Sequence, residues 1–522
     1  MEPGRYLYYL PASQLKMRAF FVLLLFLGLL LLLVGCKLAQ TDVATPAGAA
    51  NHQLPPRPAT LTARPDTLPS TPTRQSGTPT PDPTRPGQVE QGVASHVVQY
   101  GESLGYVANM YNTTVEALMS LNKLDSADNV NAGQTLLVPA GQLAIGPANK
   151  LIPDSELVYG PAFSHFHVPT FANKWGGYLL RYTEELDGTI LSGPELVQVV
   201  ARQYSVGPRL LLALLELKSN WITDPNPPES TLYYPLGKVG TGWDGLFIQL
   251  SWAANQLNRG YYGWEANWLR DVVFADGTQV QLSPGINAGT AAVQTFLSLN
   301  NSVPAWQSQA SWDGGFIKIY QSFFGNPFQY AIEPLIPPDL TPPEMSLPWG
   351  NGETWYLTGG PHGGWGSNSG WAALDFVPAG EQLGCYPSFE WVRAIAPGRV
   401  VRSENGQVVV DLGDDAFEGT GWAVLYMHIG SDGRVPEDTW VETGDKIGHP
   451  SCEGGFSNGT HLHIARRYNG RWIEADGSFP FVLDGWVPVS YASQYDGALV
   501  KGDQTREACE CRELEFNGIV KR

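Results

Sequence analysis

Basic residues are scarce in this chain. Its 522 residues include 32 lysines and arginines against 50 aspartates and glutamates, which gives a formal net charge of −18. Neutralisation of phosphates by Lys and Arg supplies most of the non-specific affinity for nucleic acid. Because no basic stripe runs along the sequence, nucleic acid is excluded as a partner. The acidity itself suits the solvated surface of an exported protein.

The amino-terminal region lacks an apolar run long enough for a membrane span of about 20 residues. The run from Ala19 to Val34 has 16 residues and follows Lys16 and Arg18, the pattern of a signal-peptide core. It ends in Leu33-Val-Gly-Cys36, which resembles the lipobox of bacterial lipoproteins, whose cysteine is acylated. We therefore expect residues 1–36 to be a lipoprotein signal peptide and Cys36 to anchor the chain to a membrane of the cell envelope, outside the cytoplasm. The alternative, an uncleaved short anchor, also exports the chain.

Residues 37–92 lack any periodic apolar face and are rich in Pro, Thr, Ala and Ser. Such a composition cannot bury a core, so the segment is expected to be a disordered tether. A second Pro-rich segment, residues 336–348, is expected to be a linker between two folded units.

Residues 96–139 predict a strand, two short helices and a second strand. Apolar and polar residues alternate in the segment that begins at His96, as in a strand. Ser103 is suited to cap a helix over 104–111, and Thr114 is suited to cap a second helix. The pattern resembles the LysM module, and the resemblance implies binding of N-acetylglucosamine-containing glycans. The candidate glycan contacts are Gly101, Glu102, Ser103, Leu104, Asn129, Val130 and Asn131.

Residues 150–335 are mostly helical by periodicity and resemble lytic transglycosylases with a lysozyme-like fold. The motif Glu216-Leu-Lys218-Ser219 carries a lysine where that family needs a glutamic acid. A lysine, with an ordinary pKa near 10.4, is a far poorer acid than a carboxyl tuned to about 6. Glu216 lies about 200° away around the helix and cannot replace it. The unit is therefore expected to be a degenerate hydrolase that either holds glycan or acts as a spacer.

The tryptophans of this middle unit could stack on sugar rings, but burial in the core is the better explanation for most of them. The residues concerned are Trp243, Trp252, Trp264 and Trp268.

Histidine is also scarce, and five of the nine histidines fall in the last third of the chain. In His461-Leu-His463 the two side chains project to one face of an extended strand and can meet one ion. His165-Phe-His167 has the same spacing with no acidic residue beside it, and we interpret that pair as structural.

Asp375 lies in an apolar segment that reads as a buried strand, where an unpartnered carboxylate costs several kcal/mol by rough estimate. A metal ion would remove this cost, and capping by backbone amides is the alternative. His428 ends an alternating segment in which it shares a face with Val424 and Tyr426, so a core histidine is the alternative there.

Together these residues fit a catalytic zinc site, which has three protein ligands and an open position for water. We assign His362, Asp375 and His463 as Zn²⁺ ligands. His428 and His461 are then left for proton transfer, with the division of roles between them open. Zinc would lower the pKa of a bound water to about 7 and polarise a carbonyl.

Residues 345–490 resemble the lysostaphin and LasA group of zinc metallopeptidases. The matching motifs are Val-Leu-Tyr-Met-His428, Thr-Gly444-Asp-Lys-Ile-Gly and Asn-Gly459-Thr-His-Leu-His. Trp371 stands where the lysostaphin branch has its first histidine ligand, and the thirteen positions from His362 to Asp375 match the LasA branch. The resemblance implies a small antiparallel β-sheet domain, expected over 349–490 with a C-terminal segment over 491–522, and peptide cross-links of peptidoglycan as substrate.

With Cys36 acylated, four cysteines remain in an oxidising compartment and permit three pairings. A disulfide between Cys385 and Cys452, inside the peptidase unit, is the first choice. Cys509 and Cys511 would point to one face of a strand, which makes a bond between them awkward. The alternatives are that they are free, that they pair with the other two cysteines, or that they bind a metal.

The sequence thus predicts a multidomain α+β lipoprotein that binds peptidoglycan and cuts its peptides with zinc. The alternative is a non-catalytic wall-binding lipoprotein that activates other wall hydrolases. The presence of all five metal-site residues favours the enzyme.

Overall fold

The structure is a computed structural model that describes residues 93–98, 102–111, 113–131, 133–139, 144–186, 188–380 and 382–522. The expected signal peptide, the tether, Cys36 and Gly101 lie outside these residues. Among the residues described, no helix has both the length and the apolar character needed to cross a membrane.

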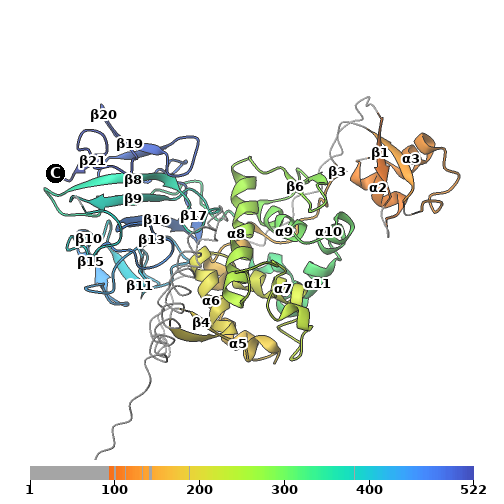
Figure 1. The fold of residues 1–522 in the computed structure, drawn as a ribbon, viewed down its shortest axis with the longest axis horizontal. Helices are drawn as coiled ribbons and strands as arrows, with labels where there is room; N and C mark the ends of the chain where they lie inside the picture. The colour runs from red at the N-terminus through yellow and green to blue at the C-terminus, as the bar shows by residue number, and fades with distance from the viewer. Residues whose placement is uncertain are drawn as a thin grey trace, which may run out of the picture. The chain divides into compact units, whose positions relative to one another are not determined.

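Residues 93–139 form the small module expected from the sequence. Its elements are β1 Val93–Val97, α2 Leu104–Met110, α3 Val115–Asn122 and β2 Thr135–Pro139 (Figure 1). The strands pair antiparallel with His96 opposite Leu136, and the Thr114 side chain caps α3 by accepting the Ala117 N–H at 3.1 Å. Val107, Leu118 and Val138 are among the buried side chains between the helices and strands. The βααβ prediction is confirmed.

A helical unit follows. Its α-helices are α4 Asp154–Leu157, α5 Val168–Ala172, α6 Gly193–Tyr204, α7 Pro208–Ser219, α8 Leu246–Glu265, α9 Ala288–Ser298, α10 Val303–Gln309 and α11 Gly315–Phe324. Short 3₁₀ turns are η1 Pro161–Phe163, η2 Tyr178–Leu180, η3 Glu229–Thr231 and η4 Pro327–Tyr330. Its strands are β3 Ala144–Ile145, β4 Thr183–Leu186, β5 Thr189–Ser192, β6 Asp271–Val273 and β7 Gln279–Gln281. The long helix α8 packs against α6 and α9.

Local capping explains where two of these helices begin. Ser192 and Glu195 form a reciprocal capping box at α6. His167 caps α5, because its Nδ1 accepts the Thr170 N–H at 3.3 Å. The interpretation of the His165 and His167 pair as structural is therefore confirmed for the capping residue.

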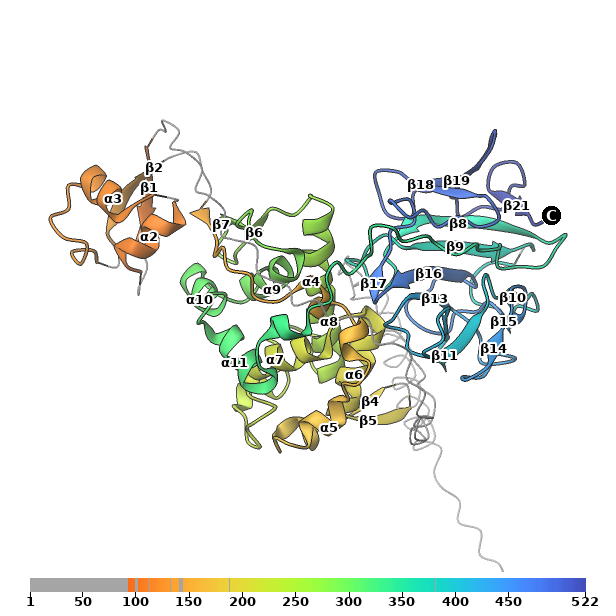
Figure 2. The ribbon, with the colours of Figure 1, turned by 180° about the vertical axis from the view of Figure 1, so that it is seen from behind.

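The last unit is built on a nine-stranded antiparallel sheet with the order β14-β11-β12-β13-β16-β9-β8-β21, and β17 pairs with β16 (Figure 2). Its strands are β8 Thr354–His362, β9 Ala373–Pro378, β11 Gly398–Glu404, β12 Gln407–Asp411, β13 Trp422–Met427, β14 Trp440–Val441, β16 Leu462–Tyr468, β17 Arg471–Trp472 and β21 Gly518–Val520. Smaller sheets pair β10 Val392–Arg393 with β15 Lys446–Gly448, and β18 Val487–Ser490 with β19 Gly497–Lys501 and β20 Gln504–Glu507.

The expected boundary at residue 490 is wrong. β21 pairs with β8 of the main sheet, with Ile519 opposite Trp355. The C-terminal residues therefore complete the main sheet, a pairing between distant segments that local sequence pattern could not indicate.

Both faces of the central strands are buried. Val424, Tyr426 and Ile464 belong to the core of this last unit. Leu425, Met427, Ala465 and others on the opposite face belong to the hydrophobic cluster of the helical unit. Double burial explains why these strands read as nearly continuous apolar runs in the sequence.

A buried ion cluster joins the two units beside this interface. The Glu418 carboxylate lies 2.6 Å from Arg202 on α6, 2.8 Å from Arg402 on β11 and 2.6 Å from Arg467 on β16, and its side chain is 3% exposed. Burial raises the pKa of Glu418, but the three guanidinium groups outweigh it and hold that pKa far below the ordinary value.

Replacing Glu418 with glutamine should lower the free energy of unfolding by about 3–5 kcal/mol at pH 7, because two buried arginines and the partly buried Arg202 lose their counter-ion. The depressed folded-state pKa makes the wild-type contribution fully present above pH about 4.3 and lost as pH falls below that value. Urea denaturation from pH 7 to pH 3 should show the difference between the two proteins narrowing by about 1.4 kcal/mol per pH unit below pH about 4.3. Exposed Glu442→Gln serves as the control, and an equal stability of all three proteins would contradict this account.

Candidate active site

Three adjacent strands bring the predicted metal ligands together. His463 on β16 is the register partner of Asp375 on β9, and His362 ends β8 beside them. His362 Nε2 lies 3.0 Å from His463 Nδ1, and Asp375 Oδ1 lies 3.3 Å from the first nitrogen and 3.2 Å from the second. Within the part of the chain that the structure describes, this is the one group of three or more such residues close enough to hold an ion.

Backbone carbonyls fix the tautomers of both imidazoles. His362 Nδ1 donates to the Gly360 carbonyl at 2.7 Å, and His463 Nε2 donates to the Gly364 carbonyl at 3.2 Å. A carbonyl can only accept, so the neutral rings present lone pairs at His362 Nε2 and His463 Nδ1. Asp375 Oδ1 is buried and has no hydrogen-bond donor.

Three acceptors therefore converge with no proton between them, an arrangement that is repulsive unless a cation lies at the centre. Ligands about 2.05 Å from a tetrahedral zinc lie about 3.3 Å apart, close to the three separations in this site. The two nitrogen and one oxygen donors are also the ligand types that zinc prefers. The residues fit the metal.

Electrostatics favour the ionised form of the aspartate. Burial raises the pKa of Asp375, but the neighbouring His362 and His461 outweigh it and hold that pKa well below its ordinary value. Burial lowers the pKa of His463, although the nearby carboxylate of Asp375 opposes this.

His428 and His461 lie side by side at the edge of this cluster, with ring centroids 4.3 Å apart. Their Nδ1 atoms donate to the carbonyls of Glu453 at 3.0 Å and Gly459 at 2.7 Å, which leaves each Nε2 available. His461 Nε2 is 3.9 Å from Asp375 Oδ1. Burial, followed by the charges of His461 and His463, lowers the pKa of His428 well below its ordinary value.

The expectation that His428 shares a face with Val424 and Tyr426 is wrong. β13 ends at Met427, and His428 has a left-handed backbone with φ 63°. This turn breaks the alternation of the strand and places the ring within 6.2 Å of the His463 ring.

Tyr495 is a residue of the site that the sequence did not reveal. Its ring stacks on His362 with centroids 4.1 Å apart, and burial together with the Asp375 charge raises its pKa to about 12. It lies in the C-terminal segment, 32 positions after His463, with no motif around it. Gly359 is another such residue. A Cβ at this position would lie 2.7 Å from Asp375 Oδ2, so only glycine leaves room for the carboxylate.

The described residues contain two disulfides. Cys385 and Cys452 are joined with an S–S distance of 2.03 Å, the pairing expected from the sequence. This bond ties the loop around Gly384 to the turn whose Glu453 carbonyl holds His428.

Cys509 and Cys511 are bonded to each other, so the expectation that such a bond would be awkward is wrong. The chain bends at residues 510 and 511 instead of running as a strand, and the two Cα atoms are 5.1 Å apart. That separation suits a disulfide.

In the LysM-like module the glycan candidates divide into two groups. The Glu102 carboxylate is 2% exposed and 2.9 Å from His96 Nε2, and Leu104 is a core residue. Ser103 caps α2 by accepting the Tyr106 N–H. The Glu102 and Leu104 side chains both point inward. Contact between this loop and a glycan stays a prediction. Exposed Asn129 and Asn131, with half-buried Val130, remain accessible.

In the helical unit, the motif Glu216-Leu-Lys218-Ser219 places no carboxyl where a transglycosylase has its catalytic acid. Burial lowers the pKa of Lys218 to about 8. The Glu216 carboxylate accepts the backbone N–H groups of Ile222 at 2.9 Å and Thr223 at 3.2 Å, so it serves the loop after α7.

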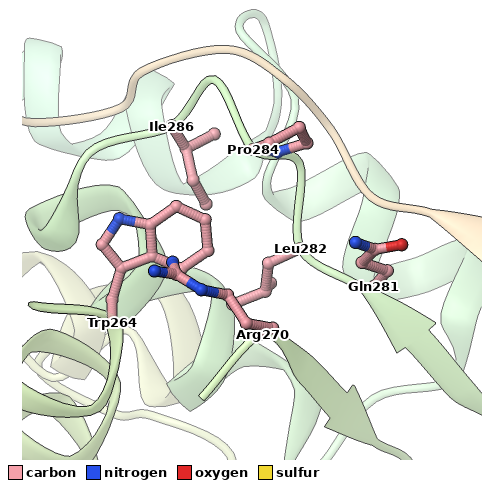
Figure 3. A pocket seen from close by; sticks show the side chains of 6 residues that line it. All are labelled: Trp264, Arg270, Gln281, Leu282, Pro284 and Ile286. Carbon is pink, nitrogen blue, oxygen red and sulfur yellow. The ribbon is translucent and has the colours of Figure 1, made fainter. Parts of the chain in front are cut away.

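Of the tryptophans of this unit, Trp252 is buried and Trp268 is 57% exposed. The Arg270 guanidinium covers the Trp264 ring at 4.1 Å beside a cavity of about 290 Å³ (Figure 3). Lys238 lies over the Trp243 ring at 4.9 Å. Stacking on sugars by these residues stays a prediction.

Three protein-family models match the chain in succession. Residues 96–139 match the LysM domain, 150–339 match "LasA, N-terminal domain", and 378–475 match "Peptidase family M23". The chain thus carries a LysM domain, a LasA N-terminal domain and an M23 peptidase domain, with mixed α and β structure. The last match includes His428, His461 and His463 but begins after His362 and Asp375.

Among curated proteins, Protease LasA of Pseudomonas aeruginosa is 29% identical over 294 residues, which are 53% of this chain and 66% of the relative. The match therefore spans just under two thirds of that protein. Among solved structures, the M23 metalloprotease pseudoalterin from the deep sea is 25% identical with a TM-score of 0.27, covering 33% of this chain and 96% of that one. The catalytic domain of lysostaphin from Staphylococcus simulans is 22% identical with a TM-score of 0.17, covering 24% and 89%.

Replacing His463 with alanine removes one of the three converging donors. Loss of a hydrogen-bond partner outside the first coordination shell lowers metal affinity by about 10–100-fold. Loss of a direct donor should therefore weaken zinc binding by more than about 100-fold. Competition with a chromophoric chelator measures this change. His449→Ala is the matched control, since His449 packs on Trp391 and is not a member of the group that could hold an ion. Zinc affinity retained in His463→Ala would rule out the assignment.

Proposed function

We propose that the chain is a zinc-dependent endopeptidase that hydrolyses peptide cross-links of bacterial peptidoglycan. The observation that carries this proposal is the convergence of three electron-pair donors from His362, Asp375 and His463 beside two further imidazoles. The M23 match and the likeness to Protease LasA support the same reaction class.

In this proposal His362, Asp375 and His463 hold the zinc. The metal would supply Lewis-acid chemistry that polarises a peptide carbonyl and acidifies water. Burial of the ligands, with His362 2% and Asp375 8% exposed, keeps their charge interactions strong.

His428 and His461 would move the protons of the reaction. Each ring is anchored at Nδ1 by a carbonyl, so each takes up or gives up a proton at Nε2. One imidazole accepts a proton from the attacking water, and the other steadies the oxyanion or gives a proton to the leaving amine. The carbonyl contacts keep both rings in the orientation that this requires.

The other modules would bring the site to its substrate. The LysM domain supports binding of the glycan strands, with Asn129, Val130 and Asn131 as proposed contacts. Export and acylation at Cys36 would hold the chain at a membrane of the cell envelope. A tethered wall-binding module raises the effective concentration of peptide at the site.

The test uses the zinc-loaded chain on purified cell walls, with and without a chelator, and measures new amines and new reducing ends separately. We expect amines to appear, the chelator to abolish them and zinc to restore them. His463→Ala should release none, while His449→Ala should match the wild type.

Two results would contradict the proposal. Wall binding with no release of amines would favour the non-catalytic activator. Release of reducing ends would instead indicate a glycosidase in the helical unit and would show the interpretation of Lys218 to be wrong.

A further inference from the structure

We propose that Asn255, on α8 of the helical unit, is a positioning residue for the metal site. It holds the loop of residues 363–370 so that the Gly364 carbonyl stays at the His463 ring. The inference rests on the proposed function, because it concerns how the zinc ligands are held. Through Asn255, the helical unit would contribute to holding the zinc ligands of the proposed site.

The loop of residues 363–370 connects His362, at the end of β8, with β9. Within the loop the Gly364 N–H donates to the Gly370 carbonyl at 3.0 Å, and the Trp365 N–H donates to Ser369 Oγ at 3.0 Å. Gly364 also supplies the carbonyl that accepts from His463 Nε2. A shift of this loop therefore moves the group that sets the tautomer of a proposed ligand.

Both the nitrogen and the oxygen of the Asn255 side-chain amide form hydrogen bonds with the loop. Nδ2 donates to Ser367 Oγ at 3.1 Å, and Oδ1 accepts the Asn368 N–H at 3.1 Å. The side chain is buried, with 8% of the residue exposed. A buried amide with both functions satisfied by one loop fixes the position of that loop strongly.

Close packing reinforces these hydrogen bonds. Gly366 has φ +68°, and a Cβ there would lie 3.0 Å from both Asn255 Oδ1 and a ring carbon of Tyr204. Trp365, 4% exposed, meets the Tyr204 ring edge-on at 6.3 Å. The loop therefore fits against α6 and α8 of the helical unit only in a narrow range of positions.

A second clamp comes from the C-terminal segment. Gln494 accepts the Gly363 N–H at 3.1 Å and donates to the Ser367 carbonyl at 3.0 Å. Because this clamp remains when Asn255 is changed, the expected effect lies near the lower end of the range for groups outside the first coordination shell. We expect a loss of about tenfold in zinc affinity.

The experiment measures the zinc dissociation constant of the full chain at pH 7 by competition with a chromophoric chelator. Asn255→Ala should raise it about tenfold. Ser367→Ala should raise it by less, because it breaks only one of the two hydrogen bonds that Asn255 makes with the loop. The double variant should be no worse than Asn255→Ala alone, because both changes break the same contact. Ser367 is exposed, so its variant keeps the test decisive if Asn255→Ala folds poorly.

Asn258→Ala is the matched control. Asn258 is a buried asparagine on the same helix, but its amide donates to the Tyr204 carbonyl at 3.0 Å and not to the loop. This variant should lose stability to a similar degree and keep wild-type zinc affinity.

The possible outcomes separate the two proposals. If the wild-type chain binds no zinc, the proposed function fails and the inference fails with it. If the wild type binds zinc and Asn255→Ala and Ser367→Ala bind it equally well, or Asn258→Ala weakens it as much as Asn255→Ala, only the positioning role is overturned.

Discussion

The meeting of two imidazole lone pairs and one carboxylate oxygen is the constraint on which this structure depends. His362 Nε2, His463 Nδ1 and Asp375 Oδ1 lie within 3.3 Å of one another. Like partial charges at this distance repel in a buried site, so the arrangement is stable only around a cation. Strand register places the side chains, and backbone carbonyls of glycine-rich loops choose which nitrogen of each ring faces inward.

These carbonyls must themselves be held, and this links the site to the rest of the chain. The Gly364 loop packs against the helical unit, and Tyr495 and Gln494 reach the site from the C-terminal segment. The helical unit also covers one face of the peptidase sheet, and Glu418 neutralises arginines from both units at that interface. The two units therefore share one folded body around the sheet, although each matches a separate family model.

Much of the site could be predicted because its residues lie in short motifs whose spacing and residue types indicate a metal site. Period-two spacing gave the shared face of His461 and His463, and the cost of burying Asp375 pointed to a metal. Alternation along Val424–Met427 correctly assigned two faces to β13. Alternation did not predict the direction of the His428 side chain, because the left-handed backbone of that residue turns the side chain away from the alternating pattern. No glycine before it indicates this turn. The inward turn of Glu102 depends on a pairing with His96 that spacing alone did not indicate.

Long-range contacts account for most of what the sequence could not predict. Tyr495, the Asn255 clamp and the pairing of β21 with β8 join segments more than 30 residues apart, without residue types that demand a partner. The Cys509–Cys511 disulfide was missed for a local reason, because a bend replaced the strand on which the prediction rested.

Zinc K-edge X-ray absorption of the metal-loaded chain tests the central claim most directly. The account predicts one zinc per chain with two imidazole nitrogens and a carboxylate oxygen at about 2.0–2.2 Å, and no sulfur neighbour. A spectrum with a sulfur shell near 2.3 Å, or a chain that retains no zinc after dialysis against metal-free buffer, would contradict it.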